Sequence, residues 1–131
     1  NEYTVIGSDT LVAFGNIILG KSKDKNDAIR MLKLLQGNSH DVYTGTTVII
    51  KKEHSIIFKT EVNKSTVYFK NMSYYDICSY VDTKEPLDKA GAYAVQGIGK
   101  VYLKGFDGDY NSIIGLDTHM IKDTFERYNL F

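Results

Sequence analysis

Runs of β-branched and aromatic residues, separated by short polar breaks, limit more than any other feature how this chain can fold. Three such runs follow one another, Val42–Ile50, Ser55–Val62 and Ser65–Phe69, with breaks at Lys51-Lys52-Glu53-His54 and at Asn63-Lys64. These residue types favour extended strands, and breaks of this length join neighbouring strands that run antiparallel. We therefore expect three adjacent, largely antiparallel strands in the middle of the chain.

A similar run opens the sequence. Tyr3–Phe14 is rich in β-branched and aromatic residues, Gly15-Asn16 can adopt the backbone angles of a tight turn, and Ile17-Ile18-Leu19 follows. This order predicts a strand, a turn and a second strand. Because the sequence starts at Asn1 and the strand-like run begins almost at once, we expect that an N-terminal element has been lost before it.

Two helices are indicated by their capping residues. Asp24 can cap a helix that ends near Gly37, and apolar residues follow at helical spacing; they are Ala28, Met31, Leu32 and Leu35. Ser73, with Asp76 three residues later, forms the pattern of a capping box and predicts a second, shorter helix.

The last part of the chain has a different composition. From Asp88 to Gly115 it is rich in glycine, with short apolar runs such as Val101-Tyr102-Leu103, which is typical of strands joined by tight loops that often form sites. Asp117 can then cap a closing helix that continues through Tyr128. The sum is an α/β fold with α+β character: a mixed sheet flanked by helices, in a single domain covering residues 1–131.

Composition excludes several classes of protein. The 16 basic residues balance the 16 acidic ones, so the chain has no overall field to attract a nucleic acid polymer. Cys78 is the only cysteine, which excludes an internal disulfide and a cysteine-built zinc site and fits a reducing compartment. No apolar run has the length of a membrane span. We expect a cytoplasmic protein that binds neither a nucleic acid polymer nor a membrane.

The segment from Gly15 to Ser22 matches the phosphate-loop pattern G-x-x-x-x-G-K-[ST]. In a true phosphate loop the intervening residues curl around the phosphates and a helix begins at the lysine. Here Ile17-Ile18-Leu19 favours a strand and the helix begins later, so we reject this interpretation. Lys21 can still contact a phosphate as a point charge at a strand end; the alternative is an ordinary solvated lysine.

Asp9 lies between two apolar runs, where a carboxylate needs partners or a metal ion. It is a candidate magnesium ligand or general base, and burial would raise its pKa towards the useful range. The alternative is a carboxylate that binds backbone N–H groups at a strand end.

Lys89 and Gln96 flank the small residues Ala90-Gly91-Ala92. A cation and an amide beside exposed backbone suit an anion and a nucleobase, although such runs also serve close packing. His40, His54 and His119 lack the spacing of metal ligands, and we expect them at the surface or in turns.

Several segments, taken in order, resemble the Maf family, also called septum formation inhibitor proteins. They are Ile6-Gly7-Ser8-Asp9-Thr10, Leu19-Gly20-Lys21, His40-Asp41-Val42-Tyr43-Thr44-Gly45, Asp88 to Gly97, and Gly108-Asp109-Tyr110 with Gly115-Leu116. The resemblance implies an α/β fold with a nucleotide cleft between two lobes, often in a homodimer. It also implies hydrolysis of a nucleoside triphosphate to the monophosphate and pyrophosphate with a divalent cation, Mg²⁺ or Mn²⁺.

Carried over by position, the resemblance makes Asp9 the catalytic, metal-binding carboxylate and Lys21 the lysine that binds phosphate. Gln96 is placed near the catalytic centre or the base, and further positions contact the substrate: Thr10, Lys89, Gly91 and Tyr93. The pair of Lys89 and Gln96 is similar to the branch that acts on dTTP and UTP.

The chain departs from the family pattern at four places. Ser8 stands where alanine is usual, Ser22 and Asp117 where proline is usual, and Ala94 where glycine is usual. The serine-rich Pro-Arg-Arg loop that holds the triphosphate in this family has no counterpart here. A catalytically silent relative that binds nucleotide or a division protein is therefore the main alternative, and a phosphohydrolase that releases orthophosphate is a third.

Overall fold

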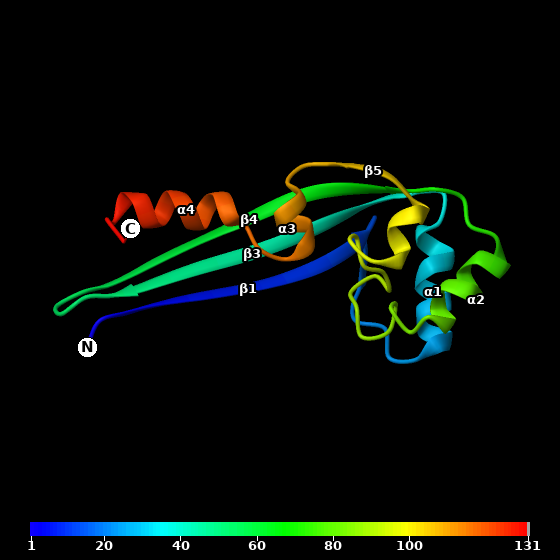
Figure 1. The fold of residues 1–131 in the computed structure, drawn as a ribbon, viewed down its shortest axis with the longest axis horizontal. Coiled ribbons are helices and arrows are strands. Elements are labelled where there is room, and N and C mark those ends of the chain that lie inside the picture. The colour runs from blue at the N-terminus through cyan, green and yellow to red at the C-terminus, as the bar shows by residue number, and fades with distance from the viewer. Residues whose placement is uncertain (131) are drawn as a thin grey trace.

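The structure is a computed structural model and describes residues 1–130. Its sheet has five strands in the order β2-β1-β3-β4-β5. The strands are β1 (Tyr3–Phe14), β2 (Ile17–Leu19), β3 (Ser39–Lys51), β4 (Ile56–Phe69) and β5 (Leu103–Asp107). Figure 1 shows that β1, β3 and β4 extend far beyond the short strands as one long, twisted arm.

The helices lie at the two ends of this sheet and, in the case of α3 (Tyr110–Ile114), over the middle of β3 and β4 (Figure 1). The others are α1 (Lys25–Leu35), α2 (Tyr74–Asp82) and α4 (Thr118–Arg127), with the 3₁₀ helix η1 (Ile98–Tyr102). In Figure 1, α1 and α2 lie together at one end, whereas α4 lies along the arm near both ends of the chain. No helix in the described part has the length and apolar character needed to cross a membrane.

The α/β class is confirmed, but the sheet corrects one expectation. Every pairing between the described strands is antiparallel, so the sheet is not mixed. The strands on each side of residues 15–16 and 52–55 are joined by tight connections, and such connections permit only antiparallel pairing. The turn at Gly15-Asn16 is found as expected, with Gly15 at a φ of 57°.

The break predicted at Asn63-Lys64 is also absent. Both residues stay in register with β3, Asn63 opposite Thr44 and Lys64 opposite Tyr43, so that residues 56–69 form a single strand. Regular pairing with β3 outweighs the low strand preference of two polar residues, because each backbone group keeps its partner. The strand expected at residues 101–103 begins only at Leu103, after η1.

The predicted caps are confirmed. Asp24 accepts a hydrogen bond from the Asp27 amide at 2.8 Å and begins α1. Ser73 and Asp76 form the reciprocal capping box of α2. Asp117 accepts from the Met120 amide at 3.0 Å and begins α4. These signals were readable because each one depends only on residues within a single helical turn.

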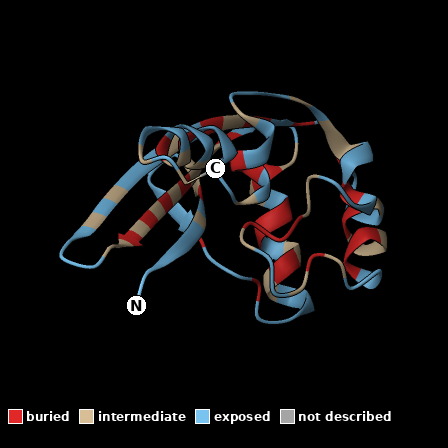
Figure 2. Cartoon of the chain, turned by 60° about the vertical axis from the view of Figure 1, so that its left-hand side comes forward, coloured by how far each residue is buried: buried red, intermediate tan, exposed pale blue. Residues whose placement is uncertain are grey.

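Two clusters of buried residues hold these elements together. The larger packs α1 and α2 against one end of the sheet, with Leu32, Leu35 and Phe69 at its centre. Figure 2 shows the buried positions concentrated at that end. The smaller joins Met120 of α4 to Val48 and Ile50 on the arm. A cavity lies beside the larger cluster and shares Val12, Val42 and Tyr93 with it.

Candidate functional site

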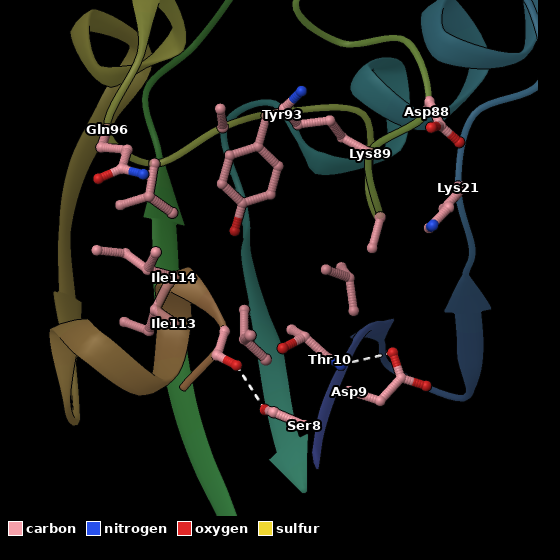
Figure 3. A pocket seen from close by; sticks show the side chains of 16 residues that line it. Ser8, Asp9, Thr10, Lys21, Asp88, Lys89, Tyr93, Gln96, Ile113 and Ile114 are labelled. Atoms are coloured by element: carbon pink, nitrogen blue, oxygen red, sulfur yellow. Dashed lines mark hydrogen bonds between the residues drawn. The ribbon is translucent and has the colours of Figure 1, made fainter. Parts of the chain in front are cut away.

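A cavity of about 350 Å³ lies between the inner face of the sheet and the glycine-rich part of the chain. Its lining comes from β1 and β3, from Lys21 two residues after β2, from residues 88–96 and from residues 113–115 (Figure 3). Of the residues selected from the sequence, it brings together Asp9, Thr10, Lys21, Lys89, Tyr93 and Gln96. These positions are widely separated along the chain.

Strand alternation builds the floor of the cavity. Ser8, Thr10 and Val12 lie on one face of β1 because side chains alternate along a strand. The hydroxyl groups of Thr10 and Thr44 are 2.9 Å apart, and the Thr44 hydroxyl donates to the Ser112 carbonyl at 2.5 Å. The Ser8 hydroxyl donates to the carbonyl of Gly115. These bonds fix α3 and the residue after it to the sheet.

The opposite wall is held by backbone pairing between residues 20–22 and residues 88–91. Lys21 pairs with Ala90 in an antiparallel bridge. The Gly91 amide donates to the Gly20 carbonyl at 3.2 Å, and the Ser22 amide donates to the Lys89 carbonyl at 3.3 Å. Lys21 is thereby set at the cavity next to the start of the glycine-rich segment.

Asp9 is less buried than the sequence predicts. Its side chain lies at the cavity but the residue is exposed, so the expected burial of this carboxylate is not found. The cause is its place on β1: β2 pairs only with residues 12–14 of that strand, and the edge before them is uncovered. Asp9 Oδ1 accepts from the Thr10 amide at 2.9 Å, which leaves Oδ2 without a hydrogen bond among the described residues.

The two ends of the cavity carry different chemistry. Figure 3 places Asp9, Lys21 and Asp88 on one side and Gln96 on the other, with Tyr93 between them. Within residues 1–130, neither Asp9 nor Lys21 takes part in a salt bridge. One end therefore offers charges to a ligand, and the other offers an amide.

The structure supports the rejection of the phosphate-loop interpretation. Residues 15–16 form the turn between β1 and β2, and Ile17–Leu19 is a strand. No backbone loop surrounds a phosphate position there, and α1 begins only at Lys25. Lys21 reaches the cavity from the end of a strand.

Gly91 is the one selected residue that does not line the cavity. It is buried behind the wall with a φ of 70°, and a Cβ atom there would meet Val12 Cγ1 at 3.0 Å. A left-handed backbone and close contact both require glycine. In this structure Gly91 shapes the wall.

The loop that carries Gln96 is anchored by Glu85. Its carboxylate accepts from the amides of Ile98 and Gly99 at 2.8 and 2.9 Å and from the Tyr80 hydroxyl at 2.6 Å. Partial burial acts to raise the pKa of Glu85, but these donors outweigh it and the pKa is lowered. The end of the cavity at Gln96 is therefore held by an ionised carboxylate.

His40 corrects the expectation that the histidines lie at the surface or in turns. It is 3% exposed on β3 and its Nε2 atom lies 2.6 Å from the Tyr93 hydroxyl. Burial lowers the pKa of His40 to about 4, against an opposing effect of Asp41. Burial also raises the pKa of Tyr93. The available signal was the alternation of the strand, which puts His40 on the same face as Val42 and Thr44.

The carboxylates at the cavity fit one kind of metal site. The described residues contain no group of three or more His, Cys, Asp or Glu side chains that could hold an ion by themselves. Mg²⁺ needs only one or two protein carboxylates when water and substrate oxygens complete its shell. The unoccupied hydrogen-bonding capacity of Asp9 Oδ2 suits such a site.

At three of the four departures from the Maf pattern, the side chain forms a hydrogen bond. Ser8 binds Gly115, and the buried Ser22 hydroxyl donates to the Pro86 carbonyl at 2.5 Å. Asp117 caps α4. At the fourth departure, the Ala94 amide donates to the Tyr80 hydroxyl at 3.2 Å. Ser8, Ser22 and Ala94 thus support the walls of the cavity, whereas Asp117 stabilises the start of α4.

Comparison with known proteins identifies the family of the chain. The family model described as Maf-like protein matches residues 1–128. The dTTP/UTP pyrophosphatase of Acholeplasma laidlawii (strain PG-8A) is 41% identical over 126 residues, which are 96% of this chain and 64% of that protein. The dTTP/UTP pyrophosphatase of Clostridium botulinum (strain Alaska E43 / Type E3) is 45% identical over 122 residues, 93% of this chain and 64% of that protein.

A third relative carries the same name. The dTTP/UTP pyrophosphatase of Thermoanaerobacter sp. (strain X514) is 41% identical over 126 residues, 96% of this chain and 65% of that protein. The chain thus spans somewhat less than two thirds of the length of the curated relatives it matches. The family model matches nearly the whole length of this chain, which shows that the chain belongs to the Maf family.

Proposed function

We propose that the cavity binds a nucleoside triphosphate and that the chain acts as a nucleoside triphosphate pyrophosphatase. The observation that carries this proposal is the polarity of the cavity. Asp9 and Lys21 lie at one end and form no salt bridge with any described residue, and the Gln96 amide lies at the other end. A nucleotide has the matching polarity, with phosphates at one end and a base at the other. The curated relatives support the same assignment by name.

Each residue has a role that follows from its chemistry. Lys21 neutralises charge on the phosphates, and Lys89 is the second cation of the lining. Asp9 aims a water molecule at the α-phosphorus and accepts its proton. A divalent cation, Mg²⁺ or Mn²⁺, held by Asp9 and by phosphate oxygens would neutralise further charge as the anhydride breaks.

The base end determines the preferred substrate in this proposal. A carboxamide such as that of Gln96 both donates and accepts hydrogen bonds, and uracil and thymine present both kinds of partner. We propose dTTP and UTP, or modified nucleotides that share this edge, as substrates. Thr10 and Tyr93 contribute further polar contacts from the lining.

A catalytically silent, nucleotide-binding relative is the second candidate, and one observation favours it. Neither of the two arginines of the sequence, Arg30 and Arg127, lines the cavity. Binding of the phosphates then depends on lysine, which cannot make the bidentate contacts of a guanidinium. Such a cavity can bind a nucleotide with little turnover.

Product analysis tests the proposal. The chain is incubated with UTP, dTTP, ATP and GTP and with Mg²⁺ or Mn²⁺, and pyrophosphate is resolved from orthophosphate. The proposal predicts pyrophosphate and the monophosphate from UTP and dTTP, and a rate at least about 100-fold lower for Asp9→Asn. Asp123→Asn, an exposed acid on α4, is the matched control and keeps the rate.

The outcomes separate the candidates. Orthophosphate as the only direct product contradicts a pyrophosphatase, as does an unchanged rate in Asp9→Asn. Nucleotide binding without any product favours the silent relative. The homodimer and the cytoplasmic location stay predictions, and light scattering coupled to size-exclusion chromatography checks the first of them.

A further inference from the structure

His40 and Tyr93 form a buried pair behind the centre of the cavity. His40 comes from β3 and is 3% exposed, and Tyr93 comes from the glycine-rich segment and is 6% exposed. His40 Nε2 and the Tyr93 hydroxyl are 2.6 Å apart, and the rings of both residues pack against Phe69. Tyr93 lines the cavity and His40 does not.

The other nitrogen of His40 decides the direction of this hydrogen bond. His40 Nδ1 is buried and has no hydrogen-bond partner. A buried N–H group without an acceptor is rarer in proteins than a buried acceptor without a donor. The favoured tautomer therefore carries its hydrogen on Nε2 and leaves only a lone pair on Nδ1. In that tautomer His40 donates and the Tyr93 oxygen accepts.

The hydrogen of the Tyr93 hydroxyl is then available to another acceptor. Among residues 1–130 this hydroxyl makes no hydrogen bond other than the one with His40. Figure 3 places Tyr93 between the end of the cavity that carries Asp9 and Lys21 and the end that carries Gln96. A nucleotide that extends from one end to the other must pass the phenol ring.

We propose that His40 is a positioning residue, which donates from Nε2 to Tyr93 and so directs the Tyr93 O–H towards an oxygen of the bound nucleotide. The inference rests on the proposed function, because it assumes a nucleotide in the cavity. It adds a residue outside the cavity to the binding machinery and gives the Tyr93 hydroxyl a defined role as donor.

The first test measures UTP affinity without a divalent cation, so that the proposed turnover does not consume the ligand, by titration calorimetry with this chain. Tyr93→Phe removes the donor, and we expect about three- to tenfold weaker binding. His40→Met keeps an apolar side chain in the core but removes Nε2–H, and a similar loss is expected. His40→Gln can still donate from its amide and should restore most of the affinity. Tyr68→Phe removes a tyrosine hydrogen bond far from the cavity and is the control.

The double variant separates positioning from general destabilisation. If His40 acts through Tyr93, His40→Met with Tyr93→Phe binds UTP no more weakly than Tyr93→Phe alone. Losses that add, or a Tyr93→Phe variant that binds like the wild type, overturn the inference while the proposed function stands. A wild-type chain that binds no UTP contradicts both the inference and the proposed function.

The tautomer is measured independently of any nucleotide. Nitrogen NMR of the wild-type chain distinguishes a protonated Nε2 from a protonated Nδ1 in a neutral imidazole. The inference predicts a proton on Nε2 of His40 and a bare Nδ1. A proton on Nδ1 would reverse the direction of the bond and refute the proposed donor role of Tyr93, whatever the affinities are.

Discussion

At the scale of single residues, His40 is an ionisable group buried in an apolar and aromatic environment. Its imidazole is packed between Phe69 and Tyr93, and its charged form has lost the solvation that water would give. Asp41 next to it acts in the opposite direction but does not restore the normal pKa. Protonation of His40 therefore opposes folding.

The pH dependence of stability follows from this shift. The pKa of His40 falls from 6.5 in the unfolded chain to about 4 in the folded one, so the unfolded state binds more protons between these values. Stability from His40 is complete above pH 6.5 and is lost as the pH falls towards 4, by at most about 3 kcal/mol. Urea unfolding at pH 7.0, 5.5 and 4.5 measures this loss of unfolding free energy. His40→Met should flatten this part of the profile. An unchanged profile would show that folding does not lower the pKa of His40.

Ser22 gives a second prediction at this scale. Its buried hydroxyl donates to the Pro86 carbonyl and helps hold the wall that carries Lys89. Ser22→Ala leaves that carbonyl without its donor and should cost about 1 to 2 kcal/mol of unfolding free energy. Thermal or urea unfolding measures the loss. The exposed Ser55 is the control position, where Ser55→Ala should change nothing; equal effects at both positions would exclude a role for the Ser22 bond.

At the scale of elements, local signals predicted structure well and non-local ones did not. The caps at Asp24, Ser73 and Asp117 were readable because each lies within one turn of its helix. The continuity of β4 through Asn63 was not, because it depends on pairing with Thr44 of the preceding strand β3 and not on a pattern within β4 itself. The short helix α3 was missed although its cap is local, with Asp109 accepting from the Ser112 amide, because five residues are too few to show a helical spacing of apolar side chains.

The attachment of α4 can be tested by one substitution. Met120 is 3% exposed and packs against Val48 and Ile50, the core of the smaller cluster. Met120→Ala should destabilise this contact by about 2 kcal/mol or more, and the amides of α4 should exchange faster with deuterium than those of α1. Lys122→Ala, an exposed change on the same helix, is the control. Equal exchange in both variants would mean that α4 does not depend on the cluster.

For the whole molecule, the cavity depends on contacts that no local pattern contains. Residues 20–22 meet residues 86–91, Ser8 meets Gly115, and His40 meets Tyr93. Sequence patterns identified Asp9 and Lys21 as candidates, but only the family resemblance predicted that they share a site with residues 88–96. Neither approach found His40, because a histidine in an alternating strand carries no sign of the residue it will contact.

We also propose that the chain behaves as one domain, as its length predicts. The strands β3 and β4 run through both buried clusters and connect them. Unfolding should then be a single transition, with the same midpoint by far-ultraviolet circular dichroism and by tyrosine fluorescence. Two separate midpoints would assign the arm with α4 and the end with α1 to independent units.

The central claim, that this cavity holds the triphosphate of a nucleotide, is tested most directly by titrating UTP into Lys21→Ala and Lys23→Ala. Both changes remove one positive charge from nearly the same place in the sequence, but only Lys21 lines the cavity. We predict that Lys21→Ala weakens UTP binding about tenfold or more, whereas Lys23→Ala binds like the wild type. Equal affinities in the two variants, or no UTP binding by the wild-type chain, would contradict the account.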